Sequence, residues 1–160
     1  MSRYQEFSDS LWVGRAKTQE EQQKHADQER ILPQAVAGVV RRMCASFQCP
    51  EERVRYIDAC SGIVTGTLPG GAPLLPFNPE KGRYCLDFQI GVAGRPEEDP
   101  YPVWVHLECV PLRPGGLEFH LGSDIFQLPD EERALFDQLA ATINRELREG
   151  YTPGARKIGW

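Results

Sequence analysis

The sequence lacks the short motifs that mark many enzyme and metal sites. It contains no Cys-x-x-Cys pair, no glycine-rich phosphate-binding loop and no Gly-x-Ser-x-Gly elbow. Without paired cysteines, the sequence supports neither a structural zinc site nor a thioredoxin-like redox pair. Any functional site must therefore be formed by residues that the fold brings together.

Long apolar stretches and a targeting signal are missing as well. No uninterrupted apolar run approaches the roughly 18 residues of a membrane span. The first residues lack the charged-then-apolar pattern of a secretory signal. The five cysteines, scattered at positions 44, 49, 60, 85 and 109, fit reduced thiols better than a disulfide framework. We therefore expect a cytoplasmic protein that does not contact the membrane.

An excess of positive charge is also absent. The net charge of −5 and a pI near 5.3 argue against nucleic acid as a partner. The 160 residues suffice for one core, and the 41% hydrophobic content is typical of globular proteins. We expect a polar helical arm over residues 1–31, a single α+β domain over residues 32–150 and a short tail over residues 151–160.

The arm has little apolar surface. Phe7, Leu11 and Trp12 predict one short apolar turn near its start. From Thr18, the sequence Thr-Gln-Glu-Glu has the pattern of a capping box and predicts a helix that continues to about Arg30. A helix that is polar all round is either a solvated arm or not stably formed.

The domain is predicted to hold N-terminal helices, a mainly antiparallel meander of four to five strands and a C-terminal helix packed on one face. Pro33 is expected to begin an amphipathic helix that ends before Pro50. Residues 50–68 predict a turn and then a strand, broken near Gly62. Residues 69–79 are rich in proline and glycine and predict a loop, whose apolar side chains should pack back on the domain: Leu74, Leu75 and Phe77.

Alternation of apolar and polar residues predicts a strand over residues 83–92, and a short edge strand is expected over residues 124–128. Pro129 then opens the predicted C-terminal helix, which stops at Gly150. Its apolar stripe consists of Leu135, Phe136, Leu139, Ile143 and Leu147.

Residues 101–122 predict a β-hairpin with a single register. Its loop is Arg113-Pro114-Gly115, closed by Leu112 opposite Gly116. This turn pairs Cys109 with Phe119 on the apolar face and Glu108 with His120 on the polar face. A slip by one residue would oppose Cys109 and His120 and break both faces.

The hairpin places His106, Glu108 and His120 side by side. Two imidazoles and a carboxylate are weak candidates for the ligands of zinc or another divalent ion. Without metal, Glu108 would orient a histidine that acts as a general base. The simpler alternative is an ordinary cross-strand pair that contributes roughly 0.2 to 1 kcal/mol. Asp87 and Gln89 are expected to extend this face.

Two functions remain open, and neither requires a cofactor. The preferred one is a non-enzymatic binding or accessory domain that contacts a protein partner or small ligand, for example an acidic helper or the inhibitor of a basic toxin. Its contact residues would be Trp104, His106, Glu108, His120 and Gln89 on the sheet, and Trp12 on the arm. A homodimer is compatible with this hypothesis.

The alternative is a small metal-dependent or acid–base enzyme of hydrolase type. His106, Glu108, His120 and Asp87 would be its catalytic candidates. Because catalysis needs a pocket that excludes water, and a bare sheet face offers none, we prefer the binding hypothesis.

Overall fold

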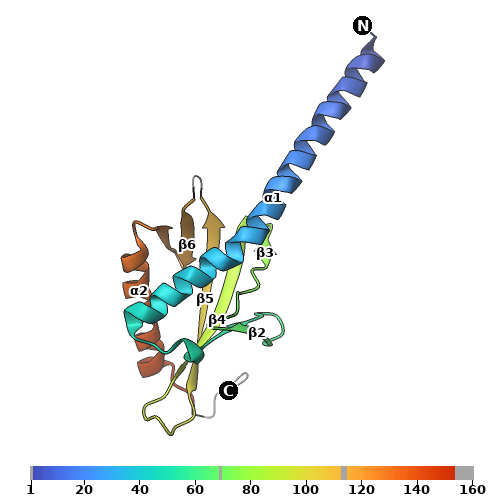
Figure 1. Ribbon diagram of the computed structural model, residues 1–160. Coiled ribbons are helices and arrows are strands. Elements are labelled where there is room, and N and C mark those ends of the chain that lie inside the picture. Colours follow the sequence, from blue (N-terminus) through green and yellow to red (C-terminus); the bar gives the residue numbers. More distant parts are fainter. Residues whose placement is uncertain (1, 69, 113–114, 154–160) are drawn as a thin grey trace. The chain divides into compact units, whose positions relative to one another are not determined.

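The computed structural model describes residues 2–68, 70–112 and 115–153, except for the side chain of His25 (Figure 1). Two predicted loop residues, Arg113 and Pro114, and most of the predicted tail lie outside these ranges. The chain divides into two compact units, residues 1–32 and 33–160, which are described separately below. Among the described residues, no helix combines the length and apolar character needed to cross a bilayer.

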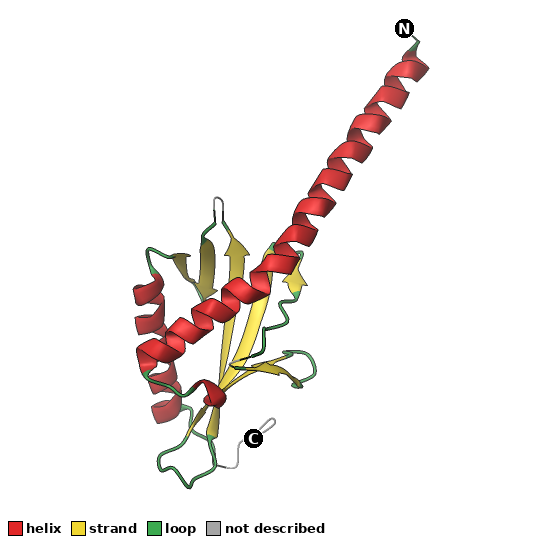
Figure 2. Ribbon diagram, viewed as in Figure 1, coloured by secondary structure: helices red, strands yellow, loops and turns green. Residues whose placement is uncertain are grey.

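Helix α1 (Arg3–Phe47) is one continuous helix that contains Pro33 in its interior (Figure 2). The predictions of helix starts at Thr18 and Pro33 were therefore wrong. The Thr18 hydroxyl donates to the carbonyl of Gly14 at 3.0 Å instead of capping a helix. A threonine inside a helix satisfies its hydroxyl in this way, so a capping-box pattern does not require a helix to begin there.

Within the second unit, the last turns of α1 carry an apolar stripe. Its buried members are Val36, Ala37, Val39, Val40, Met43 and Cys44. The helix ends where Gln48 adopts a left-handed φ of 53° and the amide of Cys49 donates to the Cys44 carbonyl at 2.9 Å. Pro50 follows, and a proline soon after the last turn is typical of helix ends. A short 3₁₀ turn, η1 (Glu51–Arg53), leads into the sheet.

In the described part of the chain, seven strands form one antiparallel sheet with the order β2-β1-β4-β5-β6-β7, and β3 pairs separately with β4. The strands are β1 (Val54–Ile57), β2 (Val64–Thr67), β3 (Phe77–Asn78), β4 (Arg83–Val92), β5 (Tyr101–Pro111), β6 (Leu117–Leu121) and β7 (Asp124–Leu128). The predicted antiparallel α+β architecture is confirmed. The predicted number of four to five strands was too low, because the segment before β4 forms three short strands.

The predicted hairpin register is confirmed. Cys109 lies opposite Phe119 and Glu108 opposite His120 on β5 and β6. Because side chains alternate between faces, this register and that of the β4–β5 pair place most buried apolar residues on one face. Its innermost side chains are Tyr56, Leu86, Phe88, Cys109 and Phe119.

The C-terminal part of α1 crosses in front of the sheet in Figure 1, and α2 (Glu132–Glu149) lies beside it. The predicted start of α2 at Pro129 was three residues early, since residues 129–131 form turns. Three stripe residues are buried, namely Leu135, Phe136 and Leu139, whereas Ile143 and Leu147 are half-buried. The guanidinium of Arg42 on α1 donates two hydrogen bonds to Glu132 on α2, at 2.8 and 3.0 Å.

The proline-rich segment does not pack as expected. Leu74 is 64% exposed and Phe77 is 40% exposed, whereas Leu75 is half-buried. Phe77 belongs to β3, where its ring lies 4.9 Å from that of Tyr84. Pro73 within the segment is buried, as is Leu68, which precedes it.

Candidate functional site

The residues predicted to form the site share the sheet face opposite the main core. Asp87 lies opposite His106, and Gln89 opposite Trp104, on β4 and β5. Glu108 and His120 continue this polar face onto β6. We refer to these six residues as the polar face.

The polar face is less exposed than predicted. Asp87 is 5%, Gln89 2% and His120 7% exposed, whereas His106 and Trp104 are accessible. All three buried residues lie on interior strands of a sheet wider than predicted. Side chains of two neighbouring strands therefore flank each of them.

Asp87 organises two of the accessible side chains. Its Oδ1 lies 2.8 Å from Nδ1 of His106 and accepts a hydrogen bond from Nε1 of Trp104 at 3.0 Å. A buried carboxylate requires such donors, since burial without them is costly. The hydrogen bond to Asp87 raises the pKa of His106, and partial burial opposes that rise. The imidazolium form of His106 is therefore favoured.

Glu108 has different partners from those predicted. Its Oε1 lies 3.0 Å from Nζ of Lys81, and its Oε2 lies 2.9 Å from Nη1 of Arg83. These cations, Lys81 foremost, hold the pKa of Glu108 below its usual value against the effect of burial. The distance from Glu108 to Nε2 of His106 is longer, at 3.8 Å. Asp87, rather than Glu108, is therefore the residue that orients His106.

His120 does not join His106 in a common site. Although its backbone lies opposite Glu108, its Nε2 lies 2.9 Å from Oε2 of Glu118 on its own strand. Among the residues that the structure describes, no group of three or more His, Cys, Asp or Glu side chains has an arrangement that could hold a metal ion. The three weak metal candidates are neighbours in the sheet, but their side chains pair with different residues.

Trp104 and Gln89 form the end of the polar face nearest β1. The Trp104 ring is 44% exposed while its nitrogen is bound to Asp87. The Oε1 atom of Gln89 is buried, and no residue in the described ranges donates a hydrogen bond to it. Trp104 is thus an accessible aromatic side chain held in a fixed orientation, as is typical of residues that contribute to protein interfaces.

Cys85 is on β4 between Arg83 and Asp87, on the same face of the sheet, and is close to the Asp87–His106 pair. A thiol, an imidazole and a carboxylate together could form a nucleophilic site. Burial, followed by the charge of Glu108, raises the pKa of Cys85, so its thiol is neutral at ordinary pH. A neutral thiol is a poor nucleophile, and the arrangement does not activate this cysteine.

Lys81 and Arg83, the two cations that bind Glu108, were not predicted from the sequence. The alternation that places Asp87 and Gln89 on the polar face also places Arg83 there, diagonal to Glu108 across the β4–β5 pair. That pattern could have identified Arg83. Lys81 precedes the strand, so alternation gave no signal for it.

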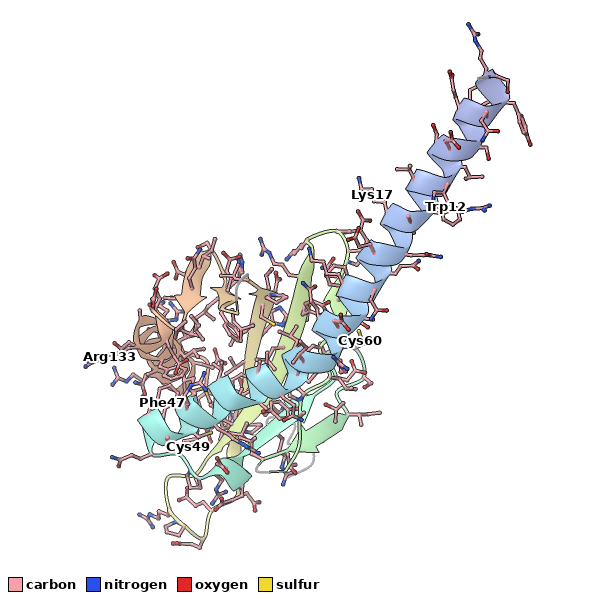
Figure 3. All side chains as sticks on the ribbon, turned by 45° about the horizontal axis from the view of Figure 1, so that its top comes forward. Trp12, Lys17, Phe47, Cys49, Cys60 and Arg133 are labelled. Atoms are coloured by element: carbon pink, nitrogen blue, oxygen red, sulfur yellow. The ribbon has the colours of Figure 1, made fainter. Side chains whose placement is uncertain are left out.

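Trp12, the contact residue predicted on the arm, belongs to the other unit. It is 74% exposed on α1, and Figure 3 shows its side chain projecting from the helix. Large exposed side chains are concentrated here: Tyr4, Phe7, Leu11, Trp12 and Val13 are each at least 55% exposed. Tyr4, Phe7 and Leu11 follow the i, i+3, i+7 spacing that defines one side of a helix.

The chain thus carries a fixed polar face with an accessible tryptophan and a helix with an exposed apolar stripe. Both are arrangements that suit contacts with another molecule. Comparison of the chain with known protein families, with curated proteins and with solved structures finds no significant match.

Proposed function

We propose that this chain is a non-enzymatic binding protein that uses the N-terminal part of α1 to contact a protein partner. The observation that carries this proposal is the exposed stripe of Tyr4, Phe7 and Leu11, defined here as the arm stripe. These side chains are 80%, 67% and 55% exposed. Complete burial of one large apolar side chain contributes about 1.5–3 kcal/mol, so three of them can supply substantial binding energy.

The length of the arm stripe indicates the kind of partner. Beyond Leu11, the same side of the helix continues with Gly14, Thr18 and Glu21. A coiled coil between two copies needs apolar heptads over about three or four repeats, and this helix has fewer. A short amphipathic helix with three anchors matches the mode in which a helix inserts into an apolar groove of a different protein.

The polar face provides a second contact surface in this proposal. Asp87 holds Trp104 and His106 in place before any partner arrives. Side chains that are already ordered lose less conformational entropy on binding. The five cysteines, all within the described residues, are free thiols, which supports a reducing compartment such as the cytoplasm.

An acid–base enzyme is the second candidate, and the 2.8 Å contact between Asp87 and His106 is the observation in its favour. Two features make it the weaker candidate. The His106 side chain is 50% exposed, whereas catalysis requires water to be excluded. Its pKa is raised, which leaves less neutral imidazole to act as a base.

Photo-crosslinking tests the arm stripe directly. Two variants each carry one photoreactive amino acid. In the first it replaces Ser8, which borders the arm stripe, and in the second it replaces Asp9. Because each residue is rotated by about 100° around the helix axis from the one before, Asp9 lies on the side opposite the stripe. In lysate of the native cell, Ser8 should crosslink one discrete protein and Asp9 should not. That protein is then purified and its affinity for this chain measured by calorimetry.

The Phe7→Ala/Leu11→Ala variant should bind the purified partner about 100-fold more weakly, as loss of two apolar anchors implies. The matched Gln5→Ala/Asp9→Ala variant alters the other side of the helix and should bind normally. Unchanged affinity of the first variant would refute the proposal. Crosslinks from Ser8 to a second copy of this chain, with dimers in sedimentation, would replace it with self-association.

A further inference from the structure

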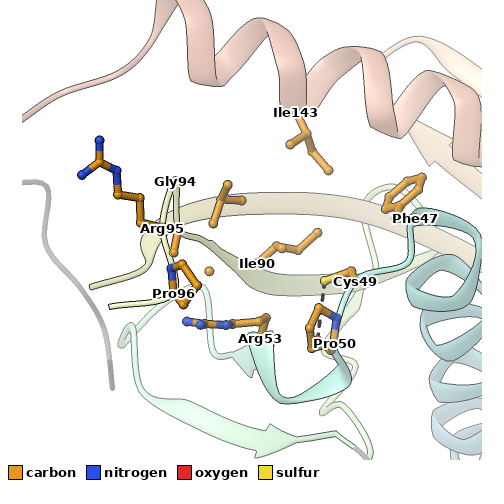
Figure 4. Close-up of a pocket in the computed structure, with 12 residues that line it drawn as sticks. Phe47, Cys49, Pro50, Arg53, Ile90, Gly94, Arg95, Pro96 and Ile143 are labelled. Atoms are coloured by element: carbon orange, nitrogen blue, oxygen red, sulfur yellow. Dashed lines mark hydrogen bonds between the residues drawn. The ribbon is translucent and has the colours of Figure 1, made fainter. Parts of the chain in front are cut away.

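A pocket of about 500 Å³ lies within the second unit, away from the polar face (Figure 4). It is formed where the end of α1, η1, the end of β4 and the loop over residues 93–96 meet the middle of α2. Its volume falls within the range of about 300–1,000 Å³ that is typical of small-molecule sites. No residue of the polar face or of the arm stripe lines it.

Most of the pocket wall is apolar. Phe47 and Ile143 line it from the two helices, and Ile90 and Val92 line it from β4. The ring of Phe47 packs edge-on against that of Phe136, with centroids 6.3 Å apart, which fixes this part of the wall. Small residues at and just after the end of β4 also line the pocket, namely Gly91, Ala93 and Gly94.

Two cations also line the pocket. Figure 4 shows the guanidinium groups of Arg53 and Arg95 on the side away from Phe47, below and above Pro96, respectively, in this view. In the portion of the chain that the structure describes, neither arginine has a carboxylate partner, unlike Arg42 and Arg83. The nearest carboxylate to this loop is that of Glu98, whose Oε2 lies against Gly94. Guanidinium groups bind carboxylates with strong, charge-assisted hydrogen bonds.

We propose that this pocket binds a small amphipathic carboxylate, with its apolar chain against Phe47, Ile90 and Ile143 and its carboxylate at Arg53, while Arg95 adds positive charge on the same side of the pocket. The apolar wall supplies affinity for the chain, and the arginines select the charge of the head group. The proposal concerns a different surface from the arm stripe and does not depend on the partner that the arm binds.

Cys49 provides an internal reporter of occupancy. It lines the pocket near Phe47, and its thiol donates to the Pro50 carbonyl at 3.5 Å. A hydrogen bond with the Cys44 thiol lowers the pKa of Cys49, which favours the thiolate form that reacts with alkylating agents. Cys60 is exposed and lies outside the pocket, so it serves as the control thiol (Figure 3).

The test uses the full chain and three probes that share one alkyl chain: decanoate, 1-decanol and decyltrimethylammonium, each below the concentration at which it aggregates. Calorimetry should show saturable binding of decanoate, at least about tenfold tighter than that of 1-decanol, as charge-assisted hydrogen bonds imply. Decyltrimethylammonium should bind more weakly still. Decanoate should slow the reaction of Cys49 with iodoacetamide, measured by peptide mass spectrometry, and leave Cys60 unaffected.

The Arg53→Gln/Arg95→Gln variant should lose the preference for decanoate over 1-decanol. The Arg133→Gln/Arg145→Gln variant makes the same change of charge at exposed positions of α2 outside the pocket. This control variant should keep the preference for decanoate. The proposal is overturned if decanoate does not saturate, if the first variant keeps the preference, or if Cys49 is not protected. Phe7→Ala/Leu11→Ala should bind decanoate normally, which separates this result from that of the arm.

Discussion

Oδ1 of Asp87 on β4 lies 2.8 Å from Nδ1 of His106 on β5, in a directly opposed cross-strand pair. The same oxygen accepts the indole N–H of Trp104. One buried carboxylate therefore fixes two accessible side chains of the polar face. Loss of this carboxylate should alter both of them without removing either.

The titration of His106 should depend on Asp87. Asp87→Asn replaces the carboxylate with a neutral amide, so the pKa of His106, raised in the wild type, should fall toward its ordinary value of about 6.5. NMR of the imidazole protons against pH measures it. Glu118→Gln alters the partner of His120 instead and should not change the pKa of His106. An unchanged midpoint in Asp87→Asn would contradict the assignment.

The contribution of His106 to stability should vary with pH. A histidine whose pKa is higher in the folded protein stabilises it fully below the unfolded pKa, about 6.5, and this stabilisation is lost as the pH rises through the folded pKa. The difference in unfolding free energy between the wild type and His106→Gln should therefore be larger at about pH 5.5 than at about pH 9. Because the side chain is 50% exposed, the change should stay below about 1 kcal/mol. Urea unfolding measures it, and a larger difference at high pH would show that the sign is wrong.

The apolar face of β4 should control the stability of the domain. Leu86→Ala removes a fully buried side chain and should lower the free energy of unfolding by about 2–5 kcal/mol. Leu74→Ala makes the same chemical change at a position that is 64% exposed, where an effect within about 0.5 kcal/mol is expected. Equal effects in urea unfolding would mean that the sheet faces are misassigned.

The contact between the two helices should contribute little. Arg42 and Glu132 form a bidentate pair, but their side chains are 56% and 18% exposed. A double-mutant cycle with Arg42→Ala and Glu132→Ala should give a coupling energy of at most about 1 kcal/mol. The coupling should shrink in high salt because salt screens exposed charges. A coupling of several kcal/mol would indicate a pair that is shielded from solvent.

The N-terminal part of α1 should exchange its amide hydrogens quickly in the absence of a partner. Residues 2–24 are exposed wherever their side chains are described, so packing adds little to the stability of this segment. Isolated helices of ordinary composition are marginal in water. Hydrogen exchange should be much faster over residues 3–24 than over β4 and should slow when the partner binds. Protection equal to that of β4 in the isolated chain would imply that the segment is already buried.

The sequence predicted the central strands and their register because two independent signals agreed there. Alternation defined the faces of residues 83–92 and 103–110, and the turn before Gly116 set the register of Glu108 opposite His120. The helical boundaries were predicted less well. Thr18 and Pro33 carry the chemistry of helix starts, but a single threonine or proline does not interrupt α1.

The side-chain pairing of the site could not be predicted from register alone. Opposed Cβ atoms bring several partners within reach, and charge and local geometry decide among them. Glu108 binds Lys81 and Arg83, while His120 turns to Glu118 on the same strand. The pocket at the end of α1 was not predictable either, since its lining comes from three segments that are distant in the sequence.

The outermost strands of the ordered sheet limit what can attach to it. Strand β7, at one end of the strand order, has only five residues, begins with the charged Asp124 and is followed by Pro129, which has no N–H to donate. Strand β2, at the other end, has four residues, including Gly66. Short edge strands that contain or adjoin a charged residue, proline or glycine offer another polypeptide few backbone groups for strand pairing. These two strands thus discourage fibrillar growth by strand addition at the edges that they form.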